Sequence, residues 1–370
     1  MNLLYLYHLI FYGVYSWYAS NNPSDSHNYY RVISSHQGGW WELFGTDTNF
    51  IHWLGFPFFQ LGFNYDMLML SFAWLGYLGF VYAYIFFREK IPLKYNFMGV
   101  DLLSLILFFP NMHFWTASLG KGAPIFLGLM MFTYAIIKPK DRLFALILSS
   151  VLIFQIRPHV FMFVAVGTAL GYMSGKEKIP FWQKALVFFS MGTALILLQD
   201  TILGVMGLEA SDNLIDEFQA VSEERAEDLS GAGSGVDMSS YPLPLKLFTF
   251  WFRPLFFDAP NILGLIVSAE NLLYLLLFLK ILKKNFVNFI KKAPAVVKMS
   301  FVIFFATSFA MTFVMSNLGI IMRQKSMVMY FLFFVIYYYL AQKKYERLLR
   351  IKRLRGKSKS REMAAEAVMP

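Results

Sequence analysis

The first candidate for chemistry is Asp25, the acid of a polar loop that runs from Asn22 to Tyr30 after an apolar N-terminal segment. A carboxylate in such a loop can accept the proton of an attacking hydroxyl, which is general-base catalysis. The spacing also fits a helix cap, with Asn22 as N-cap, Pro23 first in the helix and Asp25 third, and then Asp25 does no chemistry. The loop also holds three candidate substrate contacts, His27, Tyr29 and Tyr30.

Cationic side chains recur where apolar segments end, and they are the second set of candidates. A guanidinium fork, and an ammonium at a helix N-terminus, both favour phosphate oxygens, so together they predict a pyrophosphate site. Each alone could equally reach lipid headgroups or form an internal ion pair. The run Gly120-Lys121-Gly122 is no nucleotide-binding loop, because the required upstream glycine is missing. The predicted phosphate contacts are Lys121, Arg157, His159, Arg253, Arg323 and Lys325.

Glu270 lies in the middle of an apolar stretch, where a carboxylate is a functional candidate by default and pairing with Arg253 or another helix is the structural alternative. His113 and Trp115 are further candidate substrate contacts. The histidines His27, His113 and His159 have no metal-site spacing, so no metal and no cofactor are predicted. A divalent cation bridging Asp25 to a phosphate is conceivable, but no motif supports it.

The composition predicts a membrane protein. The 370 residues are 57% hydrophobic and 19% aromatic but only 15% charged, and long apolar runs recur along the chain. Much of the net charge of +10 falls in a C-terminal tail, residues 343–370, which suits anionic lipid headgroups or simply fixes topology. No cysteine is present, which excludes disulfides and thiolate chemistry.

We expect an all-α polytopic bundle of about ten transmembrane helices, because short basic loops alternate with apolar runs. The positive-inside rule places these loops and both termini in the cytoplasm. Residues 1–342 form the predicted transmembrane domain. The expected spans are 2–19, 64–87, 97–111, 121–137, 143–156, 160–175, 184–206, 261–282, 297–317 and 326–342.

Two consecutive hairpins have unusually short legs, between Phe97 and Ile137 and between Leu143 and Ser174. Legs of about 13 to 17 residues reach roughly 20–25 Å, less than the approximately 30 Å apolar core of a bilayer. Their tips, which contain Lys121 and Arg157, should therefore lie below the outer surface. Non-helical backbone and charged side chains at that depth are tolerated only inside protein or along a water-filled cavity. An outward-open cavity is therefore predicted.

Two extracytoplasmic loops are expected to border this cavity. The first, residues 20–63, contains an aromatic segment from Trp40 to Phe63 that should lie in the outer membrane interface. The second, residues 207–247, is acidic and then rich in Gly and Ser, which predicts either a lid or an ordinary solvated loop.

Several short motifs resemble those of bacterial membrane glycosyltransferases of the GT-C type and the related O-antigen and polysaccharide polymerases. They are the Asp-Ser-x-x-Tyr-Tyr loop from Asp25, the Phe-Trp-to-Lys hairpin of Phe114 to Lys121, the Arg-Pro-His tip at Arg157, and Arg323 near the last span. Many members carry two acids in the first loop, whereas Ser26 follows Asp25 here.

The resemblance implies transfer of a sugar from a polyprenyl-phosphate-linked donor to a glycan acceptor, at the outer face of the bacterial inner (plasma) membrane. It implies that Asp25 is the base and that Lys121, Arg157 and Arg323 bind phosphate. No nucleic-acid partner is expected. A flippase or transporter of a lipid-linked glycan, and a non-catalytic scaffold of a surface-glycan assembly system, remain alternatives.

Overall fold

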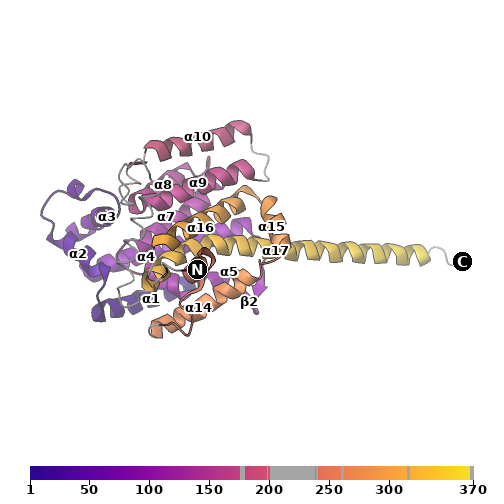
Figure 1. Cartoon of the computed structure of the whole chain (residues 1–370), viewed down its shortest axis with the longest axis horizontal. Coiled ribbons are helices and arrows are strands. Elements are labelled where there is room, and N and C mark those ends of the chain that lie inside the picture. Colours follow the sequence, from indigo (N-terminus) through magenta and orange to yellow (C-terminus); the bar gives the residue numbers. More distant parts are fainter. Residues whose placement is uncertain are drawn as a thin grey trace.

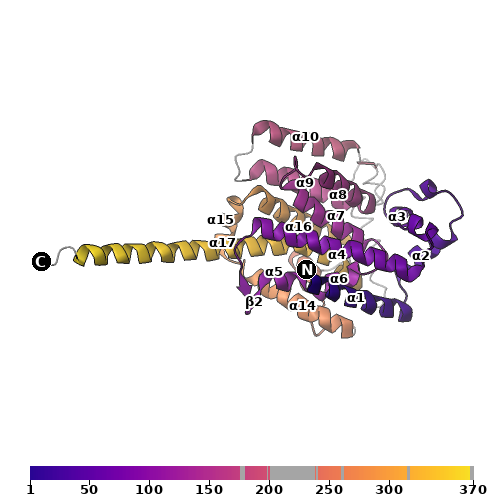
Figure 2. The same ribbon diagram turned by 180° about the vertical axis from the view of Figure 1, so that it is seen from behind.

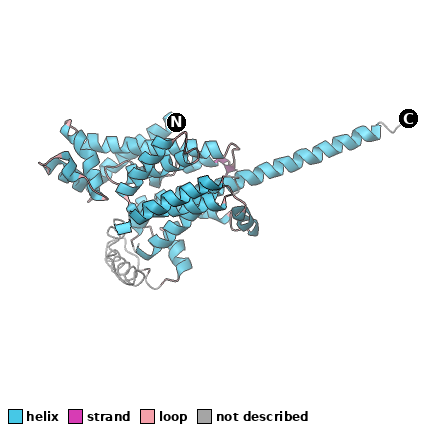
Figure 3. Ribbon diagram, turned by 90° about the horizontal axis from the view of Figure 1, so that it is seen from above, coloured by secondary structure: helices cyan, strands magenta, loops and turns pink. Residues whose placement is uncertain are grey.

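The fold is a bundle of helices, seen in a computed structural model that describes residues 1–175, 180–197, 199–200, 238, 241–259, 262–314 and 317–366. Figure 1 shows the helices stacked side by side, with α10 at one side of the bundle and α14 at the other. One helix, α17, projects far beyond the rest. Figure 3 shows that helix accounts for nearly all of the described chain.

The first third of the chain contains α1 (Asn2–Asn21), α2 (Asp25–Ser35), the 3-10 turn η1 (Trp40–Leu43), α3 (Thr48–Gln60) and α4 (Tyr65–Lys90). There follow β1 (Asn96–Phe97), β2 (Val100–Asp101), α5 (Leu102–Leu107), α6 (Pro110–Thr116), α7 (Gly122–Ile136), α8 (Leu143–Ile156), α9 (Pro158–Ser174) and α10 (Phe181–Leu197). The last elements are α13 (Leu243–Phe252), α14 (Ile262–Leu279), α15 (Lys284–Lys291), α16 (Ala295–Val314) and α17 (Leu318–Glu366).

The centre of the bundle is α7, in which every residue except Tyr134 is buried. A helix that is apolar on all sides is stable only when other helices surround it, and α4 and α8 pack along it. Small residues allow the close approach. A side chain at Gly76 of α4 would collide with the backbone oxygen of Thr116, and one at Gly79 with the ring of Phe126.

Three described helices are long and apolar enough to cross a membrane: α4, α14 and residues 295–313 of α16. A fourth span results if two arms of α17, Leu318–Lys325 and Met327–Arg355, which meet at an angle of 51°, are taken together. The shorter apolar helices α7, α8 and α9 have 15, 14 and 17 residues. The prediction of a helical membrane protein therefore holds in this coarser form.

The predicted boundaries agree closely with the observed ones for several helices, among them α1, α4, α7, α8 and α9. The expected helix 97–111 is wrong. A short β-hairpin and α5 occupy residues 96–107, and Pro110 begins a separate helix, α6, because proline lacks the N–H that a continuing helix needs. The hairpin tip before Lys121 is thus largely helical. Loop 207–247 lies outside the described residues except for Met238 and residues 241–247, where α13 begins.

The first predicted loop, 20–63, folds into α2, η1 and α3, which extend past the bundle at the end opposite the C-terminus (Figure 2). At the other end, the expected last span and the basic tail are one continuous helix, α17. Its first half is buried in the bundle and residues 345–355 are exposed. The two ends of the molecule are therefore built differently, and the candidate site lies at the end that carries α2 and α3.

Candidate functional site

Asp25 is the first residue of α2, and its carboxylate is paired with a cation from the other end of the sequence. Nη1 of Arg323, in α17, donates to Oδ2 of Asp25 at 2.7 Å. The Asp25 side chain is 60% exposed, so its carboxylate remains accessible to a ligand. The N-cap of α2 is Ser24, whose hydroxyl accepts from the Ser26 N–H, so the predicted cap at Asn22 is wrong and Asp25 is not the capping group.

A second ion pair lies beside the first. Nζ of Lys121, at the N-cap of α7, donates to Oδ2 of Asp47, the N-cap of α3. The Asp47 backbone N–H donates to the carbonyl of Gln155 at 2.6 Å, which ties the first loop to the tip between α8 and α9. Burial raises the pKa of Asp47, but the hydrogen bond and charge of Lys121 outweigh it, and the pKa lies below its ordinary value. Asp47 therefore stays ionised.

Asp47 has a strained backbone, with φ at 62° in the left-handed region that non-glycine residues seldom adopt. Such strain costs on the order of 1–3 kcal/mol and persists only where the surrounding contacts fix the conformation. The contacts to Lys121 and Gln155 do so here. In this conformation the Asp47 carboxylate lies against the start of α7.

Arg157 sits between α8 and α9 and has the least satisfied charge of the set. Its side chain is only 7% exposed, and its Nε has no hydrogen-bond partner among the described residues. Arg323 and Asp47 both interact electrostatically with it. A buried guanidinium donor without a partner is costly, so an anionic ligand would remove a penalty that the free protein carries.

Electrostatic interactions join these residues into one group. Lys121 interacts with Arg157 and Arg323, and Arg157 with Asp47. We call Asp25, Asp47, Lys121, Arg157 and Arg323 the charged cluster. Its three cations face two carboxylates, so one positive charge is uncompensated, and the cluster can take an anion beside an exposed base.

Aromatic and hydroxyl groups border the charged cluster. Tyr29 is buried, hydrogen-bonds Thr48 and approaches Gly120, where a Cβ atom would lie 3.2 Å from its ring. The Trp115 ring lies 5.7 Å below the guanidinium of Arg323, a cation–π contact. Two of the predicted substrate contacts, Tyr29 and Trp115, thus adjoin the predicted base and phosphate contacts.

Other predicted contacts lie elsewhere. His27 is exposed and packs on Tyr65, and Tyr30 packs on Phe59 and Tyr65. His159 is half-buried in the first turn of α9. His113 is fully buried, its Nδ1 lies 2.9 Å from Nδ1 of His8, and its ring stacks on Phe80.

Glu270 belongs to a separate, closed network, which we call the Glu270 network and which also includes Asn111, Asn271, Tyr274 and Lys325. Glu270 is 3% exposed; it accepts from the Asn111 N–H at 2.8 Å and from the Tyr274 hydroxyl. Lys325 is fully buried, and its Nζ donates to Asn271 Oδ1 and to the carbonyl of Arg253, both at 2.7 Å.

The prediction groups all of these cations at one site, whereas the structure divides them. Lys325 and Arg253 do not join the charged cluster: the Arg253 guanidinium pairs with Asp258, and Glu270 takes its hydrogen bonds from α6 and from its own helix rather than from Arg253. Side-chain burial decides this. Lys325 points into the bundle although it follows Arg323 by only two residues on α17, because such residues lie on different faces of a helix.

Two residues of the site were underrated or missed from the sequence. In the sequence Asp47 is a weaker acid candidate than Asp25, although the Gly-Thr-Asp-Thr run before an apolar segment is a helix-start pattern. Asn111 was no candidate, yet its Nδ2 donates to Met322 O and its Oδ1 accepts from Trp115, so it connects the two groups. No sequence signal marks such a role for a single asparagine.

No family model, curated protein or solved structure matches the chain. Among the described residues, no group of three or more His, Asp or Glu could hold a metal ion. The geometry of the charged cluster therefore carries the functional assignment.

Proposed function

We propose that the protein is a membrane glycosyltransferase or polysaccharide polymerase that transfers sugar units from a polyprenyl-phosphate-linked donor at the extracytoplasmic face. The observation that supports this most is the buried side chain of Arg157, whose Nε has no hydrogen-bond partner among the described residues, set among Lys121, Arg323 and an exposed carboxylate. Cations that lack enough acids to neutralise them fit a phosphate, and the adjacent carboxylate fits a base.

The roles follow from the contacts. Arg157 and Lys121 bind the donor phosphates, and Arg323 holds Asp25 in place through their ion pair. Asp25 takes the proton of the acceptor hydroxyl while the oxygen of that hydroxyl bonds to the anomeric carbon of the donor sugar. The bond from that carbon to the phosphate oxygen breaks, and the lipid phosphate leaves with the bonding electron pair. Tyr29 and Trp115 border the sugar, and the remaining predicted contacts lie outside this step.

The topology we propose has about ten spans, both termini in the cytoplasm and the charged cluster at the outer face of the inner membrane. Short helices support this arrangement. At 1.5 Å per residue, the 15 residues of α7 and the 14 of α8 reach about 20–23 Å, so the cations at their ends lie within the membrane's depth. The partners in this proposal are the lipid-linked sugar and the glycan acceptor.

The decisive variant is Asp25→Asn, which keeps the shape of the side chain and removes the base. We expect turnover to fall by about 10²–10⁴-fold, the usual contribution of general-base catalysis. Binding of the lipid-linked substrate should change little, because Arg157 and Lys121 remain. The readouts are the surface-glycan profile of a complemented deletion strain and substrate binding by the purified protein. Asp66→Asn, which alters an exposed acid in the first turn of α4, is the matched control.

A flippase for a lipid-linked glycan is the second candidate, since the same cations would serve transport without a base. It predicts that Asp25→Asn leaves glycan assembly nearly unchanged, and this result would overturn the enzymatic proposal. A non-catalytic scaffold would not use the cations at all. It predicts that Arg157→Gln and Arg323→Gln leave the glycan profile unchanged.

A further inference from the structure

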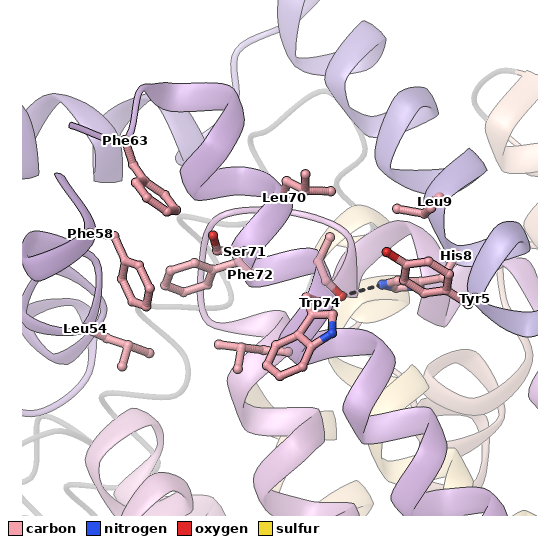
Figure 4. A pocket seen from close by; sticks show the side chains of 12 residues that line it. Tyr5, His8, Leu9, Leu54, Phe58, Phe63, Leu70, Ser71, Phe72 and Trp74 are labelled. Atoms are coloured by element: carbon pink, nitrogen blue, oxygen red, sulfur yellow. Dashed lines mark hydrogen bonds between the residues drawn. The ribbon is translucent and has the colours of Figure 1, made fainter. Parts of the chain in front are cut away.

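A cavity of about 450 Å³ opens between α1, α3 and α4, away from the charged cluster. Figure 4 shows Phe58 and Phe63 beside Phe72, and Tyr5 and Trp74 further along the wall. Two of the polar side chains in the wall are occupied: the Ser71 hydroxyl donates to Met67 O, and Nε2 of His8 lies 2.9 Å from Ala73 O. The other lining side chains are aliphatic or aromatic, so the cavity offers mainly apolar contact.

The cavity opens on the surface of α4, a helix long and apolar enough to cross a membrane. Two apolar residues on this helix, Leu70 and Trp74, line the opening and are 42% and 53% exposed. In a bilayer such an opening faces hydrocarbon, so the ligand that fits it is an apolar chain and not a water-soluble molecule.

Helix α3 connects this cavity with the charged cluster. Its N-cap, Asp47, pairs with Lys121, whereas Leu54 and Phe58 line the cavity. These residues lie 7 and 11 positions after Asp47, which is about 10 and 16 Å along the helix axis. One amphiphile can therefore place an anionic head at the start of α3 and an apolar chain beneath its second half.

We propose that this cavity binds the polyprenyl chain of the lipid whose phosphate binds at the charged cluster. The inference depends on the proposed function for the identity of the head group. The geometry favours this occupant over a bulk acyl chain because a single helix, α3, runs from the charged cluster to the cavity. A head and a chain that are linked bind both sites with a single loss of translational freedom. The cavity then selects the chain, and the cluster selects the head.

The test uses the full-length protein in phospholipid nanodiscs and two photoreactive probes, a polyprenyl phosphate and the corresponding polyprenol, each with a diazirine in the chain. Labelled peptides are identified by mass spectrometry. Two filling variants, Ser71→Trp on α4 and Leu54→Trp on α3, place a bulky ring in the cavity from different helices. Ile266→Trp, at an exposed apolar position of α14, is the matched control.

We expect both probes to label residues 54–75, and each filling variant to weaken this labelling at least about tenfold, which corresponds to about 1.4 kcal/mol. The control should change nothing. The proposal is overturned if the folded filling variants label as the wild type does, or if the excess phospholipid of the disc abolishes labelling, because a bulk acyl chain then fills the cavity.

Failure of the proposed function gives a different result. Arg157→Gln should weaken labelling by the polyprenyl phosphate at least about tenfold and leave labelling by the polyprenol unchanged. If Arg157→Gln affects neither probe while the filling variants affect both, the cavity binds the chain and the charged cluster does not bind its phosphate. Thermal unfolding of each variant establishes that it is folded.

Discussion

The charged cluster and the Glu270 network contain similar residue types but differ in how completely those residues are satisfied. In the network, the Lys325 ammonium reaches Asn271 Oδ1 and two backbone carbonyls, and Glu270 accepts two hydrogen bonds. In the charged cluster, Arg157 lacks a partner at Nε and the Asp25 carboxylate is exposed. Both sets include residues of α17, so the difference lies in the neighbours that each face of this helix meets.

The difference separates a structural use of buried charge from a functional one. A buried charge that is fully hydrogen-bonded fixes how the helices around it pack. Removing one residue of such a network leaves its hydrogen-bond partners unpaired. A buried charge without a full set of partners costs free energy in the free protein, and such groups cluster at functional sites. By this criterion Glu270 holds α14 in place, and the proposed chemistry belongs to the neighbouring charged cluster.

The largest expected effect comes from breaking the closed network. Lys325→Met should lower the stability of the folded protein by about 3–5 kcal/mol, because Asn271 and Glu270 lose a buried partner or counter-charge. Thermal unfolding in mild detergent, and the yield of folded protein, measure this. Lys280→Met, which removes an exposed lysine at the end of α14, should change stability by less than about 0.5 kcal/mol. Equal effects of the two variants on stability would contradict the structural role of the Glu270 network.

The next effect concerns the ion pair of Asp47 and Lys121, and it depends on pH. Because the pKa of Asp47 is lower in the folded protein than its ordinary value, the pair stabilises the fold above about pH 4 and loses this contribution as the pH falls through the folded pKa. Asp47→Asn should therefore cost about 1 kcal/mol at pH 7 and progressively less towards pH 3.

Thermal unfolding of both proteins across this pH range measures the difference. Asp141→Asn removes an exposed acid in the turn between α7 and α8, and it serves as the control for a general effect of removing an acid. A destabilisation by Asp47→Asn that did not shrink in acid would show that the ion pair contributes nothing and that only the backbone conformation matters.

The smallest effect should come from Trp115, which touches both groups through Arg323 and Asn111. Trp115→Phe keeps a ring face under the guanidinium and loses the hydrogen bond to Asn111, whereas Trp115→Leu loses both. We expect Trp115→Leu to weaken binding of the polyprenyl phosphate probe by about 0.5–1 kcal/mol more than Trp115→Phe does. This difference is the usual size of an exposed cation–π contact. Equal losses would mean that the hydrogen bond alone orients Arg323.

Local patterns in the sequence predicted much of the bundle, because helices α7, α8 and α9 are continuous apolar runs with clear ends. They also marked Lys121, Arg157, Arg323 and Asp25, which do lie together. What they could not predict is which acid each cation meets. Asp47 and Lys121 are 74 positions apart, and Arg323 and Asp25 are 298 apart, so their pairing depends on how helices pack in three dimensions. The inward turn of Lys325 depends on the same packing.

Helix α17 is anchored along its length. Its 51° bend leaves Arg323 on a short arm of about two turns, Leu318–Lys325, while the long arm continues into the exposed basic segment. Residues 327–341 of the long arm are almost all buried among the other helices, so they lie between the basic segment and Arg323 as a clamped stretch. The orientation of Arg323 towards Asp25 is therefore set by the core of the bundle, and the exposed segment can bind a membrane surface or a protein without moving it.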